Sequence, residues 1–181
     1  MAAPASRASS PAVLLAAELS RAEVGALLAA YGVQLVDVAP HAAIPGSYWG
    51  DAEAGLIGNS LYVRNDTPAH SLLHELGHFV CMDAARRATL AKDAGGTDDE
   101  ECGVCYLQVL LAARLTGFGA ARCLADMDAW GYSFREGSAR AWFEGDGNLA
   151  RDWLYRRGLI DSAANPTFAV HTLDARSVTD R

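Results

Sequence analysis

The chain has 181 residues, of which 51% are hydrophobic and 20% charged, and its formal net charge is −7 at pH 7. This length and hydrophobic content suffice for one packed core, so we expect a single domain. The acidic balance argues against nucleic-acid binding, which needs a basic surface, and no apolar run approaches the roughly 20 residues that span a bilayer.

The first part of the chain predicts a tail, a helix and a strand. Residues 1–19 are expected to be a disordered tail rather than a signal peptide, because their apolar run is short and they carry little positive charge. A helix over 20–31 follows, with Ser20 in a capping box and Gly32 as its stop. Residues 33–38 then alternate as a half-buried strand.

A second strand and a buried helix come next in the chain. The strand is predicted over 56–64, with a bend at Asn59-Ser60. The helix is predicted to begin at about Pro68, with Thr67 as its cap. Its hydrophobic side chains recur at helical spacing, which predicts burial; they are Leu72, Leu73, Leu76, Phe79 and Val80.

This helix carries the pentapeptide His74-Glu75-Leu76-Gly77-His78, the strongest motif in the chain. Two imidazoles four residues apart lie on one helix face and can bind one zinc ion, with the glutamate as a base beside it. Catalytic zinc usually takes three protein ligands and leaves a fourth position for water, so a third donor is needed.

Candidates for the third ligand lie at the start of a second predicted helix, entered from Thr97 as its cap. Glu100 heads a stripe of buried-type residues, whereas Glu101 shares its face with Cys105 and Gln108. Helical phase favours Glu100 as the metal ligand. If Glu100 instead closes a capping box with Thr97, Glu101 becomes the better candidate, and both remain open.

Over about residues 56–111, these two motifs resemble the gluzincin pattern of the ImmA/IrrE-type metallopeptidases. That family's second motif is an acidic helix start that ends in Phe-Ala and a pair of leucines, and aligning the pair on Leu110-Leu111 places Glu100 at the metal-binding glutamate. The resemblance implies zinc ligation by His74, His78 and Glu100, and general-base work by Glu75.

The chain also departs from the family pattern. Val104 occupies the position of a polar residue that often orients a metal-bound histidine. Asp126 or Asp128 is a candidate to take over that orienting role, and Tyr132 or His171 is a candidate to stabilise an oxyanion. No helix-turn-helix region accompanies the motif, so a role in repressor control is an analogy only.

The cysteines support an alternative function. Four cysteines without a framework pattern fit reduced thiols, and hence a cytoplasmic protein. Cys102 and Cys105 form a single Cys-x-x-Cys pair on the second helix, which we interpret as core packing. If either sulfur faces the two histidines, the site is a structural or sensory metal site.

The C-terminal third predicts short amphipathic helices over 138–143 and 148–157, and residues 166–181 are expected to form a loosely ordered tail. We therefore expect an α+β, helix-rich, zincin-like domain over 20–165, with a small sheet packed against the motif helix. The predicted function is hydrolysis of a peptide bond in a peptide or protein substrate, by water that Zn²⁺ activates and Glu75 deprotonates. The alternative is a non-catalytic metal-binding regulatory or interaction protein on the same scaffold.

Overall fold

The computed structural model describes residues 12–47, 52–91 and 94–172. The chain begins with a short 3-10 helix, η1 (Ala16–Glu18), and a first α-helix, α1 (Arg21–Ala30). Ser20 caps α1 as predicted, since its hydroxyl accepts a hydrogen bond from the backbone N–H of Glu23 at 3.3 Å. The helix therefore starts where the sequence indicated.

A three-stranded mixed sheet follows, with its strands in the order β1-β3-β2. The strands are β1 (Gln34–Asp37), β2 (Gly55–Ile57) and β3 (Ser60–Val63). β1 runs parallel to β3, and β2 pairs with β3 in antiparallel register, Leu56 opposite Leu61. The single bent strand predicted over 56–64 is therefore a β-hairpin, whose turn includes Gly58 in the left-handed region with a φ of 56°.

The motif helix, α2 (Ala69–Cys81), is the most buried element of the described chain and packs against β2, β3 and the longer helix α4 (Asp98–Ala112). It begins one residue later than predicted. The hydroxyl of Thr67 accepts from the N–H of Arg64 rather than from the helix, so Thr67 shapes the turn and not the helix end.

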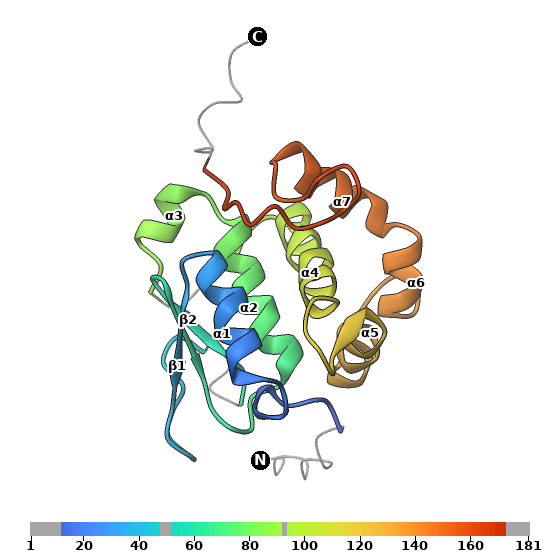
Figure 1. The fold of residues 1–181 in the computed structure, drawn as a ribbon. Coiled ribbons are helices and arrows are strands. Elements are labelled where there is room, and N and C mark those ends of the chain that lie inside the picture. Colours follow the sequence, from blue (N-terminus) through green and yellow to red (C-terminus); the bar gives the residue numbers. More distant parts are fainter. Residues whose placement is uncertain (1–11, 48–51, 92–93, 173–181) are drawn as a thin grey trace, which may run out of the picture.

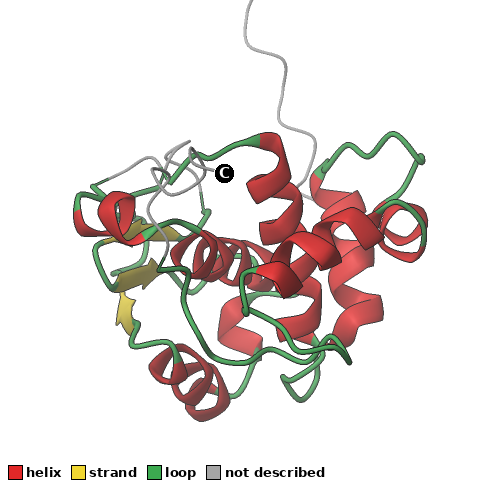
Figure 2. Ribbon diagram, turned by 90° about the horizontal axis from the view of Figure 1, so that it is seen from above, coloured by secondary structure: helices red, strands yellow, loops and turns green. Residues whose placement is uncertain are grey.

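The helices that follow α4 in the chain cover the side of α4 that faces away from the sheet, whereas the short helix after α2 lies on the sheet side (Figures 1 and 2). α4 contacts α2 on one side and two later helices on the other, which puts it at the centre of the helical layer. The other helices are α3 (Ala84–Ala88), α5 (Gly119–Trp130), α6 (Ala139–Glu144) and α7 (Gly147–Arg156).

The packed domain extends beyond the predicted limits of 20 and 165. On the N-terminal side, Leu15 bridges to Pro68, and Val13 and Leu19 are buried. On the C-terminal side, the N–H of His171 donates to the carbonyl of Val80 at 2.9 Å. Residues 12–19 and 166–172 thus belong to the fold, because their backbone groups and apolar side chains find partners there.

The fold class agrees with the prediction. The described residues form one α+β domain that is rich in helices, with a small sheet packed against the motif helix. Within that part of the chain, no helix is both long enough and apolar enough to cross a membrane.

Candidate metal centre

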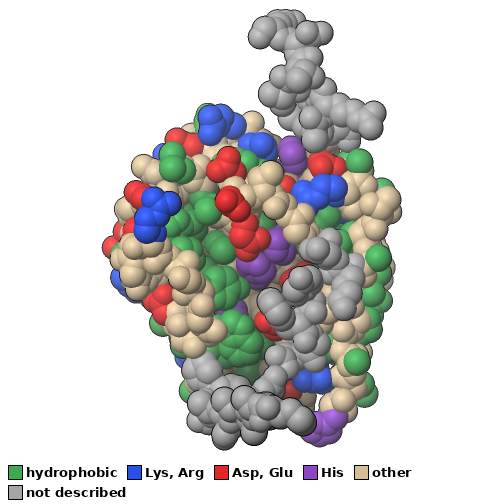
Figure 3. Space-filling model, turned by 180° about the vertical axis from the view of Figure 1, so that it is seen from behind, with side chains coloured by type: hydrophobic (Ala, Val, Ile, Leu, Met, Phe, Trp, Pro, Cys, Tyr) green, Lys and Arg blue, Asp and Glu red, His purple; other side chains and the backbone are tan. Residues whose placement is uncertain are grey.

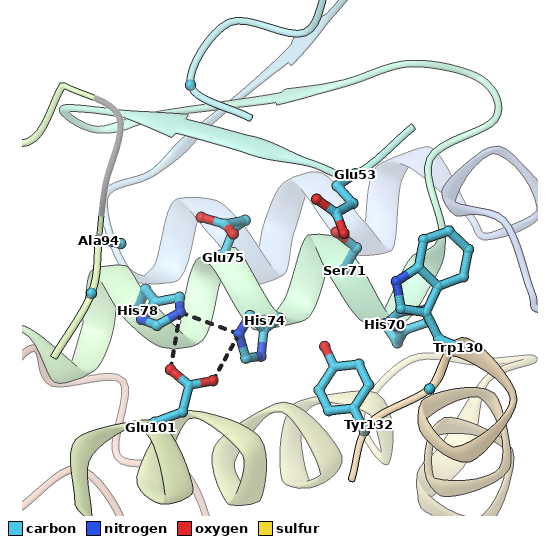
Figure 4. A pocket seen from close by; sticks show the side chains of 13 residues that line it. Glu53, His70, Ser71, His74, Glu75, His78, Ala94, Glu101, Trp130 and Tyr132 are labelled. Carbon is cyan, nitrogen blue, oxygen red and sulfur yellow. Dashed lines mark hydrogen bonds and ion pairs between the residues drawn. The ribbon is translucent and has the colours of Figure 1, made fainter. Parts of the chain in front are cut away.

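α2 presents two histidines on the face that it turns toward α4 (Figure 4). The Nε2 atoms of His74 and His78 lie 3.2 Å apart. Their rings meet edge to face, with centroids 4.7 Å apart and planes at 89°. The spacing of four residues therefore brings both ring nitrogens to one point, as the motif predicts.

Glu101 is the carboxylate that meets these two histidines. Its carboxylate oxygens lie 3.2 Å from Nε2 of His74 and 3.5 Å from Nε2 of His78. Glu100 faces elsewhere: both of its oxygens accept hydrogen bonds from Arg86 at 2.8 Å. The preference for Glu100 that rested on helical phase is wrong about this geometry, because the buried side of α4 at Glu100 faces Arg86 and not the histidines.

The two imidazole nitrogens and the two oxygens of the Glu101 carboxylate are separated by distances close to those between ligands of one zinc ion. Zinc bonds to nitrogen and oxygen of about 2.0–2.2 Å at tetrahedral angles place neighbouring ligand atoms roughly 3.3–3.6 Å apart. The observed separations among His74, His78 and Glu101 are 3.2, 3.2 and 3.5 Å. Two imidazoles and one carboxylate are also a donor set that suits zinc. These residues therefore fit a zinc ion without rearrangement of the helices.

Gln108 orients the imidazole of His74. Its Oε1 lies 2.9 Å from Nδ1 of His74 and accepts a hydrogen bond from it, which turns Nε2 toward Glu101 and leaves that nitrogen as the one that can bind a metal. In the ImmA/IrrE-type pattern a polar residue at the position of Val104 often has this orienting role, and valine cannot perform it. Gln108 performs it instead, about one turn further along α4, and was not predicted as a site residue.

Val104 has a packing role at the point where the two helices come closest. A Cβ atom on Gly77 would lie 2.9 Å from Cγ1 of Val104, which is too close for any side chain larger than glycine without a shift. The glycine inside the motif thus permits the close approach of α2 and α4. Because of that approach, the short side chain of Glu101 reaches the histidines.

The electrostatics of the site favour a positive charge between the histidines and Glu101. Burial opposes ionisation of Glu101, but its hydrogen bond to His74 and its attraction to both imidazoles outweigh burial and lower its pKa. Burial likewise opposes protonation of His74, yet contacts with Tyr132, Cys105 and Glu101 raise its pKa well above the usual value. Side chains that stabilise a proton between them in this way can hold a metal cation in place of that proton.

Glu75 lines the same cavity as the two histidines. The cavity has a volume of about 450 Å³, and its walls also include Ser71, Trp130 and Tyr132. Burial, reinforced by repulsion from Glu53 and Glu101, raises the pKa of Glu75 to about 7, and attraction to His74 only partly offsets it. Seen from behind, histidine and acidic side chains gather in a hollow beside hydrophobic surface (Figure 3).

His70 lies one turn before His74 at the far end of this cavity and is fully buried. Neither of its ring nitrogens has a hydrogen-bond partner among the described residues. Its ring contacts Trp130 and Tyr132 edge to face, with centroids 5.3 and 5.7 Å away. Burial lowers the pKa of His70 to about 3, so its imidazole is neutral in the wall of the cavity.

Tyr132 follows Gly131, which ends α5 in the left-handed conformation and directs the chain back toward the site. Its ring lies edge-on to His74, with centroids 5.7 Å apart. Burial raises its pKa, so the hydroxyl keeps its proton and can donate a hydrogen bond. Of the two predicted oxyanion stabilisers, Tyr132 lies at the site, whereas the ring of His171 pairs with the carbonyl of Cys81 at 3.0 Å.

The two aspartates predicted to orient a histidine do not reach one. Asp126 accepts hydrogen bonds from the N–H of Leu14 at 2.9 Å and from Arg122 at 2.6 Å. Asp128 accepts from the N–H of Ala139 at 2.7 Å. Both carboxylates therefore connect segments of the fold.

The two cysteines of the Cys-x-x-Cys pair lie in different surroundings. Cys102 is exposed, so the predicted core packing is wrong for this residue. Cys105 is buried, but next to the candidate metal site: its Sγ lies 4.0 Å from Oε1 of Glu101. Donor atoms of His74, Glu101 and Cys105 all fall within 4.8 Å of one another.

The chain matches no protein-family model, no curated protein sequence and no solved structure. The resemblance to gluzincins therefore rests on the motif residues alone.

Proposed function

We propose that this protein is a zinc-dependent metallopeptidase, with His74, His78 and Glu101 as the metal ligands. The observation that carries the proposal is that two imidazoles and a carboxylate, close to zinc-ligand spacing, lie on the wall of a cavity that Glu75 also lines. A site with three protein ligands beside a cavity is the arrangement of catalytic rather than structural zinc. The resemblance to ImmA/IrrE-type gluzincins supports the same conclusion.

When bound, zinc would lower the pKa of water toward about 7 and polarise the scissile carbonyl. Glu75 takes the proton from the attacking water at its carboxylate and delivers it to the leaving amine. In the metal-free site the pKa of Glu75 is raised to about 7, and the charge of a bound zinc ion would lower it, which favours the carboxylate form that accepts the proton. Gln108 keeps His74 in the tautomer that presents Nε2 to the site.

Peptide or protein is the proposed substrate. The cavity volume of about 450 Å³ accommodates a few residues of an extended chain, with Trp130 and Tyr132 as an apolar wall. The Tyr132 hydroxyl is available to donate to the oxygen of the attacked carbonyl. The four free cysteines suit a reducing compartment, so we propose a cytoplasmic protein.

Metal content tests the zinc site directly. Protein purified without added metal or an affinity tag is expected to contain about one zinc per chain by plasma mass spectrometry, as the three-ligand site implies. His78→Ala is expected to lose it. If neither protein retains metal after zinc is offered, the site does not bind zinc and the hydrolase proposal fails.

A second substitution tests the chemistry. Glu75→Gln is expected to keep the zinc and abolish cleavage of a peptide library, because the amide cannot accept the proton. Full activity in this variant would contradict the role of Glu75.

A non-catalytic metal-binding function is favoured by one observation, the Cys105 sulfur beside Glu101. A sulfur in the fourth position would close the site to water. Both functions share the metal and three ligands, so peptide cleavage by the zinc-loaded protein, with Glu75→Gln as its control, decides between them.

A further inference from the structure

Cys105 lies one turn after Glu101 on the face of α4 that meets the two histidines. Its side chain is only 5% exposed, and its sulfur lies 4.0 Å from the Glu101 oxygen that contacts His74. The donor atoms of Cys105, Glu101 and His74 lie within 4.8 Å of one another. Cys105 is thus the one thiol of this chain that reaches the candidate ligands, since Cys102 is exposed and Cys81 and Cys123 lie outside this cluster.

The distance is close to that of two atoms on one zinc ion. With zinc–sulfur and zinc–oxygen bonds of about 2.3 and 2.1 Å, sulfur and oxygen ligands at a tetrahedral angle are about 3.6 Å apart. The observed separation of 4.0 Å exceeds this by about 0.4 Å. Thiolate is also a preferred donor for zinc, so the sulfur competes well with water for the fourth position.

We propose that Cys105 is a displaceable fourth ligand, so that the resting site is closed by two histidines, a glutamate and a cysteine. This inference rests on the proposed zinc site and concerns its regulation. The thiol releases its proton to water when the sulfur binds the metal, and takes one back when the sulfur leaves, so no oxidant or reductant is needed. While the sulfur is bound the hydrolase is latent, because the position for water is filled.

Cobalt substitution tests the ligand. Co²⁺-loaded wild-type protein is expected to show a thiolate-to-cobalt charge-transfer band in the near ultraviolet. Cys105→Ser is expected to lose the band, while Cys102→Ser, a matched change one turn earlier on an exposed face, keeps it. A cobalt-loaded wild type without the band, or a band that survives in Cys105→Ser, would overturn the proposal.

X-ray absorption at the zinc edge supplies a test that needs no variant. Zinc-loaded wild type is expected to show one sulfur neighbour at about 2.3 Å among nitrogen and oxygen neighbours at about 2.0–2.2 Å. Bound zinc with nitrogen and oxygen neighbours alone would overturn the role of Cys105 and leave the proposed hydrolase standing. A protein that binds neither cobalt nor zinc would contradict both the role of Cys105 and the proposed hydrolase.

The rate of peptide cleavage tests whether the bound sulfur keeps the enzyme latent. Zinc-loaded Cys105→Ser is expected to cleave peptides faster than zinc-loaded wild type, because water then holds the fourth position. Equal or lower rates at equal zinc content would overturn the latency, whatever the spectra show.

Discussion

Acid should destabilise this protein through His70, a histidine that the fold buries without a hydrogen-bond partner among the described residues. Its pKa is about 3 in the folded chain, compared with the ordinary value of 6.5. The unfolded chain therefore binds a proton at His70 below pH 6.5 that the folded chain does not bind until about pH 3. Stability is unaffected by this group above pH 6.5 and falls as the pH drops from 6.5 toward 3.

The size of the effect follows from the two pKa values. Each pH unit between them costs about 1.4 kcal/mol, so going from pH 7 to pH 5 removes about 2 kcal/mol from the free energy of unfolding. For a urea m-value of about 2 kcal/mol per molar, this corresponds to a shift of about 1 M in the unfolding midpoint. The group is buried, so solvent screening does not reduce this figure much.

His70→Leu is the matched variant, because leucine has a similar volume and does not titrate. Urea unfolding of metal-free protein, followed by tryptophan fluorescence at pH 7 and pH 5, measures the loss for each chain. Wild type is expected to lose about 2 kcal/mol more than His70→Leu over this range. Identical losses in the two proteins would refute the reasoning, since the remaining groups titrate in both.

Three further outcomes are expected. Glu101→Gln should lose zinc by mass spectrometry, whereas Glu100→Gln should keep it. Glu100→Gln should instead lower the free energy of unfolding by about 1–3 kcal/mol, because it removes the charge paired with Arg86. Zinc loss in Glu100→Gln alone would show that Glu100, and not Glu101, is the ligand. Gln108→Leu should weaken zinc affinity about 10–100-fold in a chelator competition, since His74 loses its orienting partner, and unchanged affinity would dismiss that role. Tyr132→Phe should lower kcat about 100-fold at full zinc content, and an unaltered kcat would exclude the hydroxyl from catalysis.

The elements with strong local signals could be predicted from the sequence. α2 has a turn before it and apolar residues at helical spacing, and it forms within one residue of the predicted start. The sequence gives no start signal for α5 (Gly119–Trp130), because its N-cap residue, Phe118, has no side chain that can cap a helix. The sequence predicts one bent strand where the structure has a hairpin at Gly58, since two short strands and their turn have the same apolar pattern as one longer strand.

The third ligand illustrates why the candidate site was only partly predictable. Helical phase correctly indicates that Glu100 is buried, but burial does not reveal which neighbour a side chain meets. A usable signal was present: Glu101, Cys105 and Gln108 share one face of an otherwise apolar helix. Polar groups aligned on a buried helix need polar partners, and here those partners are the histidines of α2. The sequence shows the stripe but not the helix that it meets.

The rotation of α4 about its axis is what assigns the two adjacent glutamates to different tasks. Successive residues of a helix point about 100° apart, so α4 cannot direct both carboxylates at the histidines. Arg86 binds both oxygens of Glu100 and also donates to the carbonyls of Ala94 and Gly95, which fixes the start of the helix against the preceding loop. With Glu100 held there, Glu101 is left facing α2. Arg86 thus binds Glu100, while Glu101 faces the histidines.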